Sequence, residues 1–144
     1  MNHNRTVLVV AFLVLCTVML SGCTQIPTLP IPGTPAPGCP PAPGPVQFPP
    51  SYQEVVIQVM KNTISTDPYI MTTFAGGKGL GSVVLMETTV IRSDCKVESG
   101  QVPNPQMGSN VTLMGTTGTD LVVVNVTMTD GMTYTVVNRL LPFQ

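Results

Sequence analysis

Proline is concentrated in one stretch of this chain, and that stretch limits where a folded domain can lie. Eleven of the 27 residues at positions 24–50 are proline. Proline lacks an amide proton and fixes φ, so neither an α-helix nor a central β-strand is open to such a segment. As a polyproline II chain at about 3.1 Å per residue it would reach roughly 80 Å. We interpret it as a tether rather than as a ligand for an aromatic groove, and expect the folded domain in residues 51–144.

The residues after this tether favour β-structure. Val, Ile, Thr and Tyr dominate them, and turn residues recur at short intervals. The pattern predicts an all-β domain, a small antiparallel β-sandwich or barrel of about 6–7 strands. The segment 54–60 also suits a helix face, so strand and helix both remain open there. The expected strands are 54–60, 69–74, 82–92, 96–102, 110–116, 121–128 and 132–141.

The last two expected strands allow a prediction of register. A two-residue turn at Asp130-Gly131 would set the apolar face of 121–128 beside threonines. A three-residue loop at 129–131 sets it beside apolar residues, with Gly131 in the left-handed region. A one-residue slip exchanges the faces of a strand, so the apolar match favours the three-residue loop. The expected pairs are Met128 with Met132, Val126 with Tyr134 and Val124 with Val136.

Residues that carry catalysis are scarce. The only histidine is His3, which excludes Ser-His-Asp and Cys-His systems and His-rich zinc sites from the rest of the chain. The glycine-rich segment 75–81 lacks the phosphate-loop pattern, because Lys78 is followed by Gly79. Carboxylate pairs could still hydrolyse glycosides, although the chain has no Trp to form a sugar platform. We expect no enzymatic activity, with a carboxylate-based hydrolase as a minor alternative that would use Glu54, Asp67, Glu87, Asp94, Glu98, Asp120 or Asp130.

Two further kinds of site can be considered. Thioethers are soft ligands suited to Cu(I), and the expected hairpin makes Met128 and Met132 neighbours. Methionine is also common core filler, and no histidine accompanies this pair, so we expect no metal site and no cofactor. Asn110-Val111-Thr112 and Asn125-Val126-Thr127 match N-glycosylation acceptors. Asn110 and Asn125 are therefore candidate glycosylation sites, with a chance match as the alternative.

The N-terminal segment has the form of an export signal. Residues 1–6 are polar and include Arg5, and residues 7–20 are apolar except for Thr17. A helix of this length spans about 21 Å, less than the roughly 30 Å of a bilayer's hydrocarbon core. Leu20-Ser21-Gly22-Cys23 follows and resembles the lipobox of prokaryotic lipoprotein precursors. The resemblance implies a signal peptide at 1–22, lipid on Cys23, and a lipidated tether at 23–50; an ordinary signal peptide is the alternative.

The remaining cysteines are expected to pair. Cys16 would leave with the signal peptide and Cys23 would carry lipid, which leaves Cys39 and Cys95. Two cysteines in an oxidising compartment suggest a disulfide. Two free thiols, or Cys39 bonded to another chain, are the alternatives.

Charge limits the partners of the chain. After removal of the signal peptide, five basic and seven acidic residues remain, a net charge near −2. Without a basic stripe, nucleic acid binding is not expected, and attachment to the membrane would depend on the lipid.

We therefore expect a lipid-anchored, outward-facing protein of the cell membrane, extracellular or periplasmic. Its β domain would be a non-enzymatic module that binds an envelope or extracellular protein or ligand. The alternative is a structural subunit or anchor of an extracellular assembly.

Overall fold

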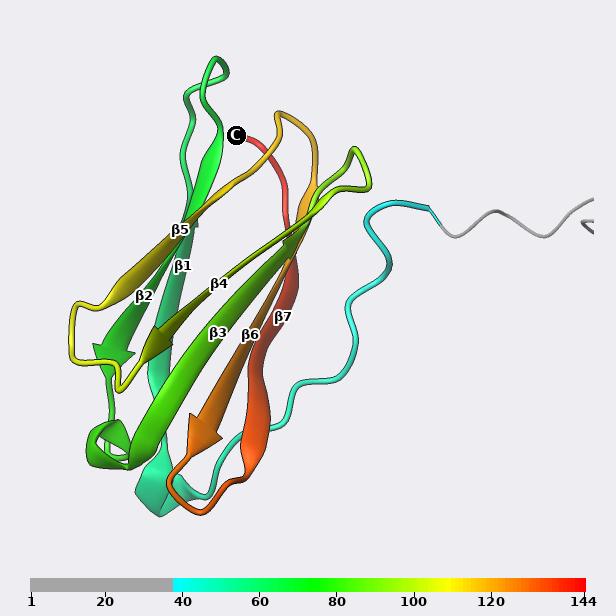
Figure 1. Cartoon of the computed structure of the whole chain (residues 1–144). Helices are drawn as coiled ribbons and strands as arrows, with labels where there is room; N and C mark the ends of the chain where they lie inside the picture. The colour runs from blue at the N-terminus through cyan, green and yellow to red at the C-terminus, as the bar shows by residue number, and fades with distance from the viewer. Residues whose placement is uncertain (1–37) are drawn as a thin grey trace, which may run out of the picture. The chain divides into compact units, whose positions relative to one another are not determined.

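A computed structural model describes residues 38–144 of the chain. The expected signal peptide, the lipobox and Cys23 lie outside the described residues. Seven strands form two antiparallel sheets, and each strand coincides with one expected from the sequence (Figure 1). The segment open to helix or strand is a strand. The strands are β1 (Val56–Lys61), β2 (Tyr69–Gly76), β3 (Val83–Ile91), β4 (Val97–Pro103), β5 (Asn110–Met114), β6 (Asp120–Met128) and β7 (Thr133–Leu141).

The two sheets pack face to face as a sandwich, which confirms the fold class. One sheet has the order β1-β2-β5 and the other has the order β4-β3-β6-β7. The hairpins β1-β2, β3-β4 and β6-β7 stay within one sheet, whereas the links β2-β3, β4-β5 and β5-β6 cross between the sheets. Alternate residues of each strand therefore face the core or the outside.

The core lies between the sheets and is made mainly by the central strands. In β6, Val122, Val124, Val126 and Met128 are fully buried. They pack with residues of β2 and β3 from both sheets, since the core cluster also contains Ile70, Phe74, Met86 and Val90. The alternation of apolar and polar residues in the sequence matches this inward face.

The β6-β7 hairpin confirms the expected loop and corrects one pair. Val126 lies opposite Tyr134, Met128 N donates to Met132 O at 2.9 Å, and Gly131 has a φ of 82°. The expected pairing of Val124 with Val136 is wrong, because Val124 lies opposite Val137. The register shifts between Val124 and Asn125, so β7 carries an extra residue there, as in a β-bulge.

Part of the expected tether packs on the domain. Residues 39–50, here called the N-terminal strap, run beside β7 in Figure 1. Gln47 N donates to Thr135 O of β7 at 2.8 Å. A side chain added at Gly44 would come within 3.0 Å of Asn138 Nδ2. Within residues 38–144, the strap is thus packed against the domain that follows it. The strap pairs with β7 at Thr135, where the outer edge of β7 would otherwise offer an unpaired carbonyl.

Candidate functional site

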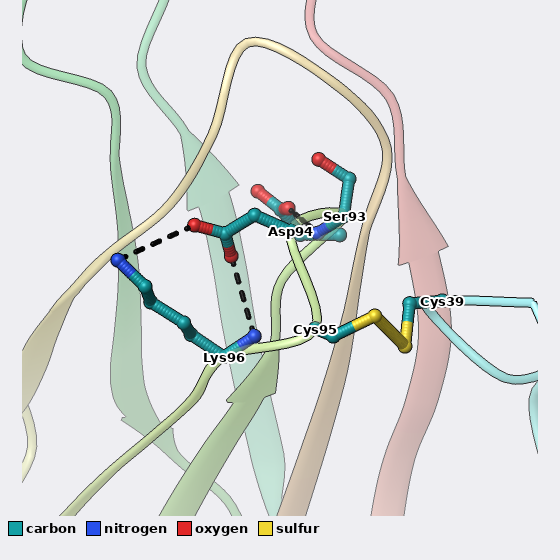
Figure 2. Close-up of a disulfide and its surroundings, with 6 residues drawn as sticks. Cys39, Ser93, Asp94, Cys95 and Lys96 are labelled. Carbon is teal, nitrogen blue, oxygen red and sulfur yellow. Dashed lines mark hydrogen bonds and ion pairs between the residues drawn. A yellow bond between two sulfur atoms is a disulfide. The ribbon is translucent and has the colours of Figure 1, made fainter.

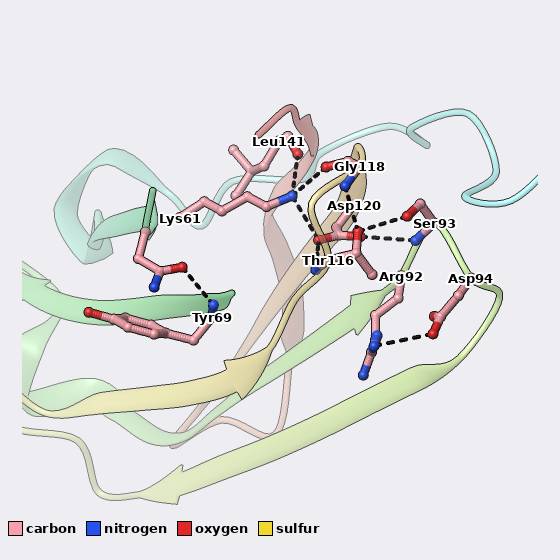
Figure 3. A network of polar contacts seen from close by, with 10 residues as sticks. Lys61, Tyr69, Arg92, Ser93, Asp94, Thr116, Gly118, Asp120 and Leu141 are labelled. Carbon is pink, nitrogen blue, oxygen red and sulfur yellow. Dashed lines mark hydrogen bonds and ion pairs between the residues drawn. The ribbon is translucent and has the colours of Figure 1, made fainter. Parts of the chain in front are cut away.

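The most elaborate polar cluster lies at the end of the sandwich where β1 and β7 finish and β6 begins (Figure 3). Its centre is an ion pair between Lys61 Nζ and Asp120 Oδ2 at 2.8 Å. The Lys61 side chain is 5% exposed and the Asp120 side chain is 0% exposed. Lys61 Nζ also donates to Gly118 O at 2.6 Å and to Leu141 O at 3.2 Å, so all three of its protons are used.

Both carboxylate oxygens of Asp120 likewise accept two hydrogen bonds each. Its Oδ1 accepts from Ser93 N at 2.9 Å and from Thr116 Oγ1 at 2.6 Å. Its Oδ2 accepts from Thr116 N at 2.8 Å, besides Lys61. One carboxylate therefore joins the end of β1, the β3-β4 turn and the β5-β6 loop to the start of β6.

These contacts control the ionisation of Asp120. Burial by itself would raise the pKa of this carboxyl. The hydrogen bonds from Lys61, Thr116 and the Ser93 amide outweigh burial and hold the pKa below its ordinary value of 3.8. The carboxylate is thus kept ionised, and it has no free lone pair aimed at solvent. The arrangement suits a structural clamp rather than a general acid or base.

Two more acids gather beside this clamp. Arg92 Nη2 lies 3.1 Å from Asp94 Oδ2, and Arg92 Nη1 lies 3.6 Å from Glu98 Oε1. Lys96 Nζ also lies 3.8 Å from Asp94 Oδ2. The sequence-predicted acids Asp94, Glu98 and Asp120 are therefore near one another, but each is paired with a base. Three carboxylates that each face a cation are not arranged as the acid–base pair of a glycoside hydrolase.

The other predicted acids lie apart from this cluster. Glu54 lines a pocket with Phe48, Pro49, Ser51 and Val55. Glu87 lies on the outer face of β3, and Asp67 lies in the β1-β2 loop. Asp130 lies in the β6-β7 loop, where its Oδ1 accepts from Met132 N at 2.9 Å. The structure does not bring these four together.

The disulfide joins Cys39 of the strap to Cys95 of the β3-β4 turn (Figure 2). Their Cα atoms are 5.3 Å apart, within the range usual for a disulfide. This is the pairing expected from the sequence. Cys95 has a φ of 67°, a left-handed conformation that non-glycine residues rarely adopt. Cys95, whose Sγ is bonded to Cys39 of the strap, therefore has an unfavourable backbone conformation.

The two candidate glycosylation sites differ in accessibility. Asn110 is exposed at the start of the edge strand β5. Asn125 lies within β6 between β3 and β7, and its Oδ1 accepts from Thr135 Oγ1 at 2.8 Å. A glycan on Asn125 would have to displace this hydrogen bond, whereas Asn110 is exposed.

The methionine pair considered from sequence does not form a surface site. Met128 is fully buried in the core, whereas Met132 is 56% exposed. The hairpin brings their backbones together but separates their side chains, because Met128 belongs to the inward face of β6. Among residues 38–144, no group of three or more His, Cys, Asp or Glu side chains is placed to hold a metal ion.

Lys61 is the residue of the cluster that sequence reasoning missed. It is the last residue of a strand rich in β-branched residues, and Asn62 and Thr63 after it are typical of a turn. The only available signal is the alternation of β1, which places position 61 with Ile57 and Val59 on the inward face. A lysine at such a position needs a buried partner.

A scan against protein families finds no match for this chain, and searches of curated proteins and of solved structures find no similar protein. Within residues 38–144, no helix is long and apolar enough to cross a membrane.

Proposed function

We propose that this chain is a membrane-anchored lipoprotein that faces outward, and that its β domain is a non-enzymatic binding module. The observation that carries the location is the Cys39–Cys95 disulfide. Disulfides persist in oxidising compartments outside the cytoplasm, which agrees with the export signal and with the lipobox at Leu20-Ser21-Gly22-Cys23. Two acyl chains on Cys23 would hold the chain stably, because one chain alone binds only marginally.

The strap limits how far such a module would stand from the lipid. Residues 24–38 would separate Cys23 from the strap. At no more than about 3.6 Å per residue, these fifteen residues reach at most roughly 55 Å. The module would therefore work closer to the membrane than a tether extending to residue 50 would allow.

The arrangement of charged groups supports a non-enzymatic role. Asp120 is engaged by Lys61, and Asp94 and Glu98 are both engaged by Arg92. The pocket beneath the strap, about 210 Å³, is lined by Val46, Ile57 and residues 136–139 of β7, with Arg139 its one charged group. A pocket with one cation and no carboxylate lacks the acid–base pair of a hydrolase.

The strap also bears on the alternative of a structural subunit that assembles through strand edges. Edge pairing needs free backbone groups on an outer strand. Gln47 N of the strap donates to Thr135 O of β7, so one position of this edge is occupied. This contact favours the binding module over assembly through β7.

The location is tested with the full chain in its native membranes. We expect wild type in the membrane fraction, with a mass that begins at Cys23 and includes lipid. Cys23→Ser should move the protein to the soluble fraction, because no polybasic run would replace the lipid. Cys16→Ser is the matched control and should remain in the membrane. A wild-type mass that lacks lipid or retains residues 1–22 would overturn the anchor.

The role is tested by the state of the purified protein. Sedimentation of the detergent-solubilised chain at micromolar concentration should give a monomer. Self-association under these conditions would favour the structural subunit over the binding module.

A further inference from the structure

We propose that a pocket beside the start of β1, here called the Glu54 pocket, binds a lysine side chain of a partner protein. The inference rests on the proposed function, because it names the class of ligand that the binding module takes. The pocket is lined by Phe48, Pro49, Ser51, Glu54 and Val55.

The Glu54 pocket lies at the end of the sandwich opposite the disulfide. Glu54 comes two residues before β1, and its carbonyl accepts from Gly79 N, in the link from β2 to β3, at 2.9 Å. Cys95 lies in the turn after β3, at the other end of that strand (Figure 1). The strap begins at Cys39, which is bonded to Cys95. Attachment to lipid through the segment before Cys39 would therefore leave the Glu54 pocket open to a partner.

The backbone behind the pocket is held in place by its neighbours. Gly77 and Gly79 lie so close to the backbone of residues 53–55 that a Cβ on either glycine would overlap it. Val55 packs against the core cluster. The segment that carries Glu54 is therefore positioned before a ligand arrives, which lowers the entropic cost of binding.

The lining of the pocket combines one charge with apolar surface. Glu54 is its only charged side chain, and Ser51 adds a hydroxyl group. Phe48, Pro49 and Val55 provide apolar surface, and Phe48 is 69% exposed. A lysine side chain has the matching chemistry, because its aliphatic stem packs on apolar groups while its ammonium group pairs with a carboxylate.

Glu54 has no counter-ion in the part of the chain that the structure describes. Asp94, Glu98 and Asp120 each face a base, but none of the ion pairs includes Glu54. Lys78 lies on the glycine-rich loop that contacts the Glu54 segment, yet it forms no ion pair with Glu54 either. The carboxylate of Glu54 is thus available to a cation from another molecule.

The size and polar groups of the pocket favour lysine over other ligands. Its volume of about 320 Å³ is at the lower end of the range for ligand sites, so it suits a single side chain. The ammonium group of lysine has three donors, which one carboxylate, one hydroxyl and water can satisfy. The guanidinium group of arginine has five donors in a fixed plane, and more of them would stay unpaired here.

The test follows backbone amide resonances of the detergent-solubilised full chain by NMR while a blocked amino acid is added. With Nα-acetyl-lysine N-methylamide, the shifts should saturate and should centre on residues 48–55. Nα-acetyl-norleucine N-methylamide has a similar stem without the charge. It should bind about fivefold more weakly, the change expected from the loss of one exposed ion pair.

Three variants separate the charge from the apolar surface. Glu54→Gln should weaken binding of the lysine probe about fivefold and leave binding of the norleucine probe unchanged, because only the ion pair is lost. Glu87→Gln is the matched control, since Glu87 is exposed and also takes no part in the ion pairs of the described residues; it should change neither affinity. Phe48→Ala should weaken both probes, because both stems pack on the ring.

The same spectra show whether each variant is folded, since amide resonances away from residues 48–55 should stay where they are in wild type. The proposal is overturned if the shifts do not saturate, or if Glu54→Gln affects the two probes equally. Tighter binding of Nα-acetyl-arginine N-methylamide than of the lysine probe would overturn the choice of lysine. Fractionation of Cys23→Ser and sedimentation test the proposed function separately, so failure of the Glu54 pocket can be told from failure of the lipoprotein.

Discussion

At the scale of single residues, Asp120 holds one end of the sandwich together. Its carboxylate accepts from two backbone amides and one hydroxyl, and it pairs with Lys61, from positions that are far apart in sequence. Buried ion pairs do not always stabilise a fold, but removal of one partner leaves an uncompensated charge. The contribution of Asp120 to stability is therefore best measured by a substitution that keeps the shape of its side chain.

We expect Asp120→Asn to lower the free energy of unfolding by about 3–5 kcal/mol, because Lys61 would remain buried without its counter-ion. Urea unfolding at pH 7 measures this change. Glu87→Gln is the matched control, since Glu87 is exposed and takes no part in the ion pairs of residues 38–144. It should shift stability by less than about 0.5 kcal/mol. Equal effects of the two substitutions would contradict the clamp.

The same carboxylate predicts a pH dependence. Its pKa is lowered in the folded state, so its contribution is complete above the ordinary value of 3.8 and is lost as pH falls through the folded pKa. The stability difference between wild type and Asp120→Asn should thus stay constant from pH 7 to about pH 5 and shrink below about pH 4. Urea midpoints from pH 7 to pH 2 check this. A difference that grew on acidification would reverse the assigned sign.

At the scale of elements, the β6-β7 hairpin combines a turn set by its own residues with a bulge set by its neighbours. Gly131 adopts a φ of 82° in the loop between the strands. Beyond the loop, the extra residue at the bulge changes which β7 side chains face β6. Val136 is 8% exposed, and Val137 lies opposite Val124.

We expect Gly131→Ala to lower stability by roughly 1–2 kcal/mol, because an L-residue is strained in the left-handed region. No atom lies within 4 Å of a Cβ placed at Gly131. The loss of stability would therefore come from backbone strain and not from a steric clash. Gly81 is the matched control, since it too has open space but lacks a positive φ. Thermal unfolding should show a smaller loss for Gly131→Asn than for Gly131→Ala, and no loss for Gly81→Ala. Strain at Gly131 would be excluded if Gly131→Ala and Gly81→Ala behaved alike.

At the scale of the whole molecule, the strap makes residues 39–50 of the proline-rich region part of the folded unit. The disulfide fixes one end of it to the β3-β4 turn, and the Gln47 amide fixes the other end to β7. The strap covers β7, an outer strand of the four-stranded sheet. A loop of 56 residues is closed by this single bond.

Removal of the disulfide should loosen the strap and destabilise the domain. We expect the double variant Cys39→Ser, Cys95→Ser to lose up to about 4 kcal/mol, the chain-entropy value for a loop of this length. Hydrogen exchange at the Gln47 amide should become faster, because its bond to Thr135 would open with the strap. Cys23→Ser should change neither quantity. Unaltered protection of Gln47 in the double variant would show that the strap holds without the disulfide.

Local patterns in the sequence determined the strands, the three-residue loop at 129–131 and the cysteines available to pair. β-Branched runs, turn residues and period-two alternation act over a few residues, so they can be read without the fold. Only the tertiary structure decided the partner of Lys61, the bulge at Val136 and the docking of the strap. Each of these depends on which strands become neighbours. Strand order follows from how the two sheets bury their faces against each other, a property that no single segment carries.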